Sequence, residues 1–119
     1  MKRFTFVFIS VAFALALTAC GGAASRAQEV QVETTEFKFL PATIQVEAGK
    51  PVKLTLLNKG SVEHDLSVVE ILLIDVKTTT DSRGHEMSNI PIQPKLHVAA
   101  VAGKSSVIEF TPTRPGTYE

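Results

Sequence analysis

Cysteine is almost absent from this chain, because Cys20 is the only one among 119 residues. One cysteine cannot form an intrachain disulfide, so a small domain must rely on its apolar core or on a bound metal. Tryptophan is missing altogether, and with it the Cys-Trp-Cys pattern of immunoglobulin domains. The chain also lacks an excess of positive or negative charge, since it has 12 basic and 12 acidic residues. A balanced chain gives no reason to expect a nucleic acid as partner.

Motifs of common enzyme classes are lacking as well. The chain has no Gly-x-Ser-x-Gly nucleophile motif, no glycine-rich phosphate loop and no His-Glu-x-x-His metal motif. We therefore predict that it is not an enzyme.

The N-terminus carries a targeting signal. Lys2 and Arg3 precede an apolar run over residues 4–17, and small residues follow up to Cys20, an order that is typical of a secretory signal. Leu17-Thr18-Ala19-Cys20 resembles the bacterial lipobox, in which the cysteine is acylated and becomes the mature N-terminus. We expect a lipoprotein signal peptide over 1–19 and lipidation of Cys20. The stronger alternative is an ordinary cleaved signal with an incidental cysteine. A transmembrane anchor is the weaker alternative, because a membrane-spanning segment needs about 20 apolar residues.

Such processing would leave one small exported domain. Loss of Lys2 and Arg3 changes the balance from 12 against 12 to 10 basic against 12 acidic residues. Residues 20–28 are rich in Gly, Ala and Ser and cannot bury enough apolar surface to fold, so we expect a flexible tether there. Residues 29–119 have the length of a single domain. The predicted location is the membrane surface, facing the periplasm or the cell exterior.

The remaining chain reads as a series of short strands. The clearest is 51–57, where Val52, Leu54 and Leu56 alternate with polar residues. Turn residues recur every 8 to 12 positions or so, and no helical period is sustained, which predicts an antiparallel Greek-key β-sandwich. The other expected strands cover residues 30–33, 44–46, 66–74, 96–100 and 107–111.

Several expectations concern packing within this sandwich. The phenylalanines at positions 37, 39 and 110 are expected in the core, because aromatic side chains dominate the packing of small domains. The apolar stretch 66–74 is expected to be one strand buried on both faces, or a strand entering a covered loop. The polar segment 78–89 is predicted to be an exposed loop, and the prolines in 90–94 are predicted to keep that segment irregular or at an edge.

One segment within this series of strands contains a candidate functional residue. The segment "NKGSVEHDLSV" places His64 after a strand and an Asn-x-Gly turn, at the start of a second apolar strand. Together with "FKFLPATIQVEAGKPVKLTLLNKG" and "VAGKSSVIEFTPTRPGTYE", it resembles the cupredoxin family of small copper proteins, typified by plastocyanin and auracyanin. The resemblance implies type 1 copper held by two histidines, a cysteine thiolate and a weak axial methionine, with His64 as the first histidine.

The same resemblance places the other three ligands after the Pro-Gly-Thr-Tyr strand. In this chain that motif is followed only by Glu119. We expect the sequence to be a fragment that stops before the Cys, His and Met of the copper loop. The chain as written is then expected to lack a complete blue-copper site.

The other histidines give weaker signals. His85 lies in a polar loop and is expected to be solvated, while His97 is expected to be partly exposed within a strand. A second metal site could combine His64 with Asp65 and with the loop residues His85, Glu86 and Met87. Their spacing matches no recognised metal signature.

The leading functional hypothesis is an exported, membrane-tethered cupredoxin that transfers single electrons. Redox proteins of the membrane or periplasm would be its partners, as the resemblance implies. The alternative is a copper carrier, or an accessory or structural β-sandwich lipoprotein without redox activity.

Overall fold

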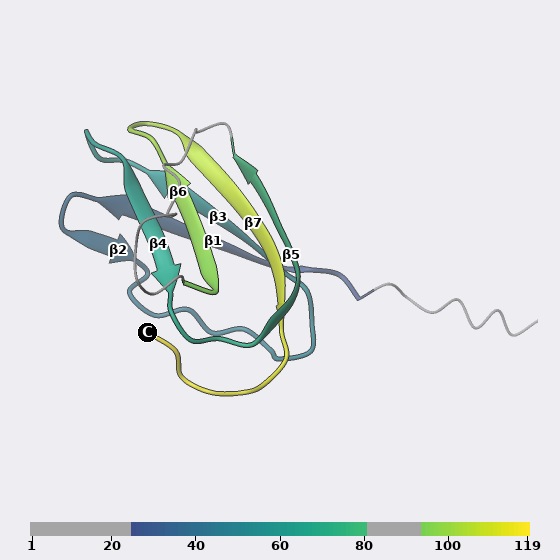
Figure 1. Cartoon of the computed structure of the whole chain (residues 1–119). Helices are drawn as coiled ribbons and strands as arrows, with labels where there is room; N and C mark the ends of the chain where they lie inside the picture. Colours follow the sequence, from purple (N-terminus) through teal and green to yellow (C-terminus); the bar gives the residue numbers. More distant parts are fainter. Residues whose placement is uncertain (1–24, 81–93) are drawn as a thin grey trace, which may run out of the picture.

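The computed structural model describes residues 25–80 and 94–119. Cys20, His85, Glu86 and Met87 lie outside these ranges. The described residues form strands without any helix (Figure 1), so none of them belongs to a helix long and apolar enough to cross a membrane. The strands are β1 (Gln28–Thr35), β2 (Lys38–Leu40), β3 (Val52–Asn58), β4 (His64–Val68), β5 (Leu73–Thr80), β6 (Leu96–Ala100) and β7 (Ser105–Pro112).

The strands form two sheets. Five of them lie in the order β2-β1-β3-β7-β5, and β4 pairs with β6 in a separate two-stranded sheet. The predicted all-β sandwich is confirmed, but its pairing is not purely antiparallel because β1 and β3 are parallel. Parallel neighbours require a connection that returns the chain to its starting end. The connection formed by β2 and residues 41–51 does this before β3 begins.

The core lies between the sheets and follows the alternation seen in the sequence. In β3, every second side chain from Val52 to Asn58 is buried, and the residues between them are half-buried. Such alternation is expected where one face of a strand is covered and the other is not. The buried core residues are Val32, Val52, Leu54, Leu56, Leu96, Val98, Ala100, Ile108 and Phe110.

Two of the three phenylalanines expected in the core lie outside it. Phe110 is buried, but Phe37 is 98% exposed and Phe39 is 40% exposed. Thr35 pairs with Lys38 in the β1–β2 hairpin, which leaves Glu36 and Phe37 as the two residues of the turn. A side chain at the tip of a two-residue hairpin extends beyond the sheet, so the prediction for Phe37 was wrong for a geometric reason.

The apolar stretch 66–74 is also not one continuous buried strand. β4 ends at Val68 in one sheet, and β5 begins at Leu73 in the other. Leu72, in the link between the two sheets, is 54% exposed. Residues 78–80 belong to β5 rather than to the predicted loop, whereas 81–93 lie outside the described residues. Residues 113–119 are described and form no strand.

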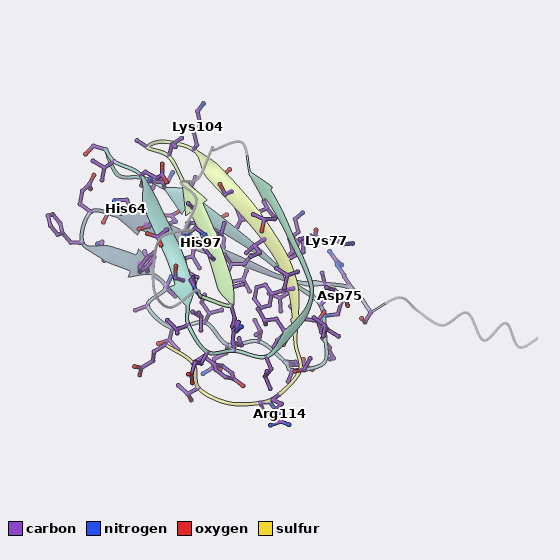
Figure 2. The ribbon with its side chains drawn as sticks, viewed as in Figure 1. His64, Asp75, Lys77, His97, Lys104 and Arg114 are labelled. Atoms are coloured by element: carbon purple, nitrogen blue, oxygen red, sulfur yellow. The ribbon has the colours of Figure 1, made fainter. Side chains whose placement is uncertain are left out.

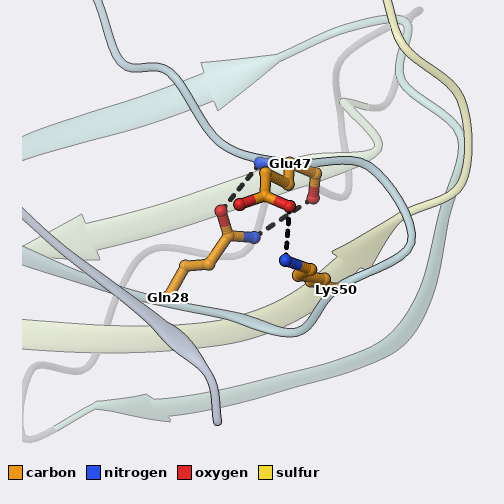
Figure 3. Close-up of polar contacts among 3 residues, drawn as sticks. All are labelled: Gln28, Glu47 and Lys50. Carbon is orange, nitrogen blue, oxygen red and sulfur yellow. Dashed lines mark hydrogen bonds and ion pairs between the residues drawn. The ribbon is translucent and has the colours of Figure 1, made fainter. Parts of the chain in front are cut away.

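Polar contacts close the end of the sandwich at which β1 begins (Figure 3). The Gln28 side-chain amide donates to the Glu47 carbonyl oxygen over 3.1 Å, and its Oε1 accepts the Glu47 backbone N–H over 2.7 Å. Lys50 forms an ion pair with the Glu47 carboxylate. Exposed ion pairs contribute little, but the paired amide contacts attach the connection between β2 and β3 to the first residue of β1.

Candidate metal-ligand histidine

His64 lies at the opposite end of the sandwich. It is the first residue of β4 and pairs with Ala100, the last residue of β6. Figure 2 shows His64 on β4 and His97 on the neighbouring strand β6. The loop 59–63 joins the end of β3 to His64, so the histidine is positioned where the two sheets meet.

Asn58 fixes this loop. Its side chain is fully buried, and its Nδ2 donates to the Val62 carbonyl over 2.7 Å and to the Ala100 carbonyl over 2.8 Å. Its Oδ1 accepts the Gly60 backbone N–H over 2.8 Å. Every hydrogen-bonding group of the amide is therefore engaged, which also determines its orientation. The bond to Ala100 connects β3 in one sheet to the residue paired with His64 in the other.

The imidazole of His64 has an unusual environment. Its Nε2 atom is buried and has no hydrogen-bond partner among the described residues. A Cβ atom added at Gly60 would lie 3.0 Å from this nitrogen, 2.8 Å from Glu36 Oε1 and 3.1 Å from Asn58 Oδ1. Buried polar groups are normally satisfied, and only a glycine leaves room for these three atoms. The turn at Gly60 thus has a packing role that the sequence pattern did not reveal.

Glu36 approaches this loop from the tip of the β1–β2 hairpin. Its Oε1 accepts hydrogen bonds from the Ser61 backbone N–H and, over 2.7 Å, from the Ser61 hydroxyl. These two bonds, the backbone one first, and a third from the backbone of Glu36 itself lower the pKa of Glu36 to about 2, and the proximity of His64 adds to the effect. Glu36 was not predicted from the sequence, because 25 residues separate it from Ser61 and no local pattern connects them.

His97, the other histidine among the described residues, lies on the opposite face of the β4–β6 sheet from His64. His97 Nε2 is 3.5 Å from Asp65 Oδ2, which also accepts a hydrogen bond from Ser67 over 3.0 Å. The expected partial exposure of His97 is confirmed. Successive strand residues face opposite sides, so Asp65 is directed away from His64. This arrangement separates two residues of the alternative metal site, whose remaining members lie outside the described ranges.

His64 meets the requirements for one ligand of a copper site. Imidazole nitrogen is a suitable donor for copper, and the buried Nε2, which has no hydrogen-bond partner among the described residues, belongs to the strand residue that follows the loop held by Asn58. No cluster of three or more His, Cys, Asp or Glu side chains that could hold a metal ion occurs within residues 25–80 and 94–119. The described part of the chain therefore offers one member of such a ligand set.

Comparison with known proteins agrees with this architecture. No characterised protein matches the chain in sequence. The model of the cupredoxin-like domain family matches residues 5–119, and this chain therefore belongs to the cupredoxin-like family.

Proposed function

We propose that this chain belongs to an exported, membrane-tethered copper protein in which His64 binds type 1 copper and the metal transfers single electrons. The supporting observation is the placement of His64 at the start of β4, with a buried ring nitrogen that finds no hydrogen-bond partner in the described part of the chain. Copper, when bound, would supply the one-electron redox chemistry. Burial of the Nε2 atom excludes water from that side of the ring.

The remaining ligands follow from the family resemblance. A cysteine, a histidine and a methionine are proposed as the further ligands, as the resemblance implies. A rigid scaffold is needed because several ligands must be held together around the metal. Asn58 contributes to it with three hydrogen bonds that hold the loop before His64.

The strand register places His64 far from the proposed point of attachment to the membrane. Gln28 pairs with Val52 at one end of β1, whereas Thr34 pairs with Asn58 at the other. These ends are six residue steps apart, or about 20 Å at the usual rise of a strand. If the residues between Cys20 and β1 form the tether from a lipid on Cys20, the His64 end faces away from the membrane and toward redox partners.

The test is copper binding by the protein encoded by the complete reading frame. We expect copper(II) to produce an intense thiolate-to-copper band in the visible spectrum and a reversible one-electron couple. His64→Ala should abolish the band. His97→Ala is the matched control, because His97 lies on the other face of the same sheet, and it should retain the band.

Two outcomes would contradict electron transfer. Tight copper binding without a reversible couple would favour a copper carrier. Absence of copper binding by a folded protein would favour an accessory or structural lipoprotein.

A further inference from the structure

A row of charged side chains crosses the outer face of the five-stranded sheet, the face directed away from β4 and β6. Lys53 on β3 pairs with Glu29 on β1 and with Glu109 on β7. Glu109 pairs in turn with Lys77 on β5. Paired residues share one face of a sheet, and this face is the outer one because the neighbours of Lys53 in β3 belong to the core. The row therefore reads minus, plus, minus, plus across β1, β3, β7 and β5.

The four charges of this row are accessible to a partner. Glu29, Glu109 and Lys77 are exposed, and Lys53 is half-buried. Figure 2 shows Lys77 on β5, the strand at the edge of the sheet. No ion pair joins these four side chains to one another in the described part of the chain. The row can therefore form ion pairs with a surface that carries the opposite order of charges.

A second copy of this chain carries that opposite order. Rotation by 180° about an axis that runs along the strands, between β3 and β7, brings Lys77 of one copy opposite Glu29 of the other. The same rotation brings Glu109 opposite Lys53. A two-fold contact uses the same surface on both subunits, so this surface must be complementary to itself. An alternating row of four charges meets this condition, whereas a row of one sign would repel its own copy.

The two neighbouring rows on the outer face do not oppose this contact. They contain one charged residue, Glu33, and otherwise uncharged side chains. Their members are Gln31, Thr55 and Val107 in one row and Glu33, Leu57 and Ser105 in the other. The same rotation brings Thr55 opposite Val107 and Leu57 opposite Ser105, so the centre of the contact adds no repulsion between like charges.

The direction of the axis also suits two chains on one membrane. Because the axis runs along the strands, both copies keep the Gln28 end of β1 on the same side of the dimer. Two tethers can then reach the same membrane, a point that rests on the proposed function. Exposed ion pairs are individually weak, but confinement on a membrane raises the effective concentration of the two surfaces.

We propose that the outer face of the five-stranded sheet is the contact surface of a two-fold symmetric dimer of this chain. In this dimer Lys53 of each copy meets Glu109 of the other, and Glu29 of each copy meets Lys77 of the other.

Reciprocal charge reversal tests the contact. Lys53→Glu and Glu109→Lys each place like charges opposite one another in a dimer of identical chains. When the two variants are mixed, the reversed positions face each other and opposite charges meet again. Within each chain, positions 53 and 109 remain neighbours of like charge. Recovery on mixing therefore reports a contact between copies and not one within a chain.

The protein encoded by the complete reading frame is reconstituted in lipid vesicles and treated with a carbodiimide, which joins a carboxylate directly to a lysine amine. In the mixture, a link between positions 53 and 109 can connect only two different chains, because each variant carries one sign of charge at both positions. The wild type and the equimolar mixture should give similar yields of covalent dimer, and the mixture should contain this link. Each variant alone should give about tenfold less, because two-fold symmetry doubles every unfavourable contact. High salt should lower the wild-type yield.

The matched control is the pair Lys50→Glu and Glu47→Lys. It makes the same reversals in an exposed ion pair that lies in the connection before β3, outside the sheet. These variants should give the wild-type yield, alone or mixed. Circular dichroism verifies that all four variants are folded.

Two outcomes would overturn the proposal. Absence of a wild-type dimer would show that no second copy binds this face. Equal yields from the face variants alone and from their mixture would show that the copies meet elsewhere. Failure of the proposed function is recognised separately, by copper titration and by release of the protein from the vesicles. If the protein is released, the same comparison in concentrated solution tests the dimer.

Discussion

Replacement of Asn58 by alanine should destabilise this domain far more than its location at a strand end suggests. The side chain is fully buried and makes three hydrogen bonds, two to carbonyl oxygens and one from a backbone N–H. Each bond contributes roughly 0.5–1.5 kcal/mol, so the total loss should be about 3 kcal/mol. The loss is large because the Ala100 carbonyl, buried between the sheets, is deprived of this donor.

Urea unfolding followed by far-ultraviolet circular dichroism measures the change in the free energy of unfolding. Thr34→Val is the matched control, because Thr34 is equally buried and pairs with Asn58 across the β1–β3 ladder. Within the described ranges, its hydroxyl donates only to the neighbouring Thr35 carbonyl, over 3.3 Å. We expect this variant to lose less than about 1 kcal/mol. The reasoning is refuted if Asn58→Ala loses no more than the control.

Asn58→Asp tests the direction of the amide. The aspartate retains an acceptor for the Gly60 N–H but turns an oxygen toward two carbonyls, so at pH 7 it should be less stable than Asn58→Ala. Burial raises the pKa of this carboxyl above its unfolded value of about 3.9, and protonation supplies a donor. The stability of Asn58→Asp relative to the wild type should therefore be greatest below a pH of about 3.9 and should be lost as the pH rises through the folded-state pKa. If the difference in stability between Asn58→Asp and the wild type does not change with pH, hydrogen-bond donation by the residue 58 side chain is not what stabilises the domain.

Three further predictions concern the same domain. Gly60→Ala should displace the NMR resonances of the adjacent imidazole, because its Cβ would lie within 3.1 Å of three polar atoms; unchanged resonances would contradict the close packing. Acidification should weaken the wild type, because Ser61 lowers the pKa of Glu36 to about 2. That contribution is complete above the unfolded pKa of about 4.3 and is lost as the pH falls toward 2, whereas Glu36→Gln should lack this part of the acid dependence in urea titrations. Leu56→Ala should lose about 2–5 kcal/mol and Phe37→Ala no more than about 0.5 kcal/mol, as measured by urea unfolding; similar losses would refute the assignment of Phe37 to an exposed turn.

Local alternation made much of the fold predictable. The strands β3, β6 and β7 were expected at 51–57, 96–100 and 107–111, and they occur at Val52–Asn58, Leu96–Ala100 and Ser105–Pro112. A strand that is buried on one face carries a period of two in its own sequence, so neighbouring residues are sufficient to identify it. The same local context, together with the family resemblance, predicted His64 as a metal ligand, and this stays a prediction.

Local context failed where the position of a residue depends on its pairing partner. Phe37 has the composition of a core residue, but the pairing of Thr35 with Lys38 places it at a hairpin tip. Residues 66–74 form a continuous apolar run, but pairing with β6 and then with β7 divides them between two sheets.

The sequence by itself determined the strand periodicity, and it is also the source of two untested predictions, an N-terminal targeting signal and a metal-binding histidine. Only the tertiary structure brought Glu36 and Ser61, 25 residues apart, into contact beside that histidine. It also placed the Asn58 amide against the carbonyl of Ala100, 42 residues away. The physical reason is that burial alternation is a property of one strand, whereas the polar surroundings of a side chain depend on which distant segments the two sheets bring together.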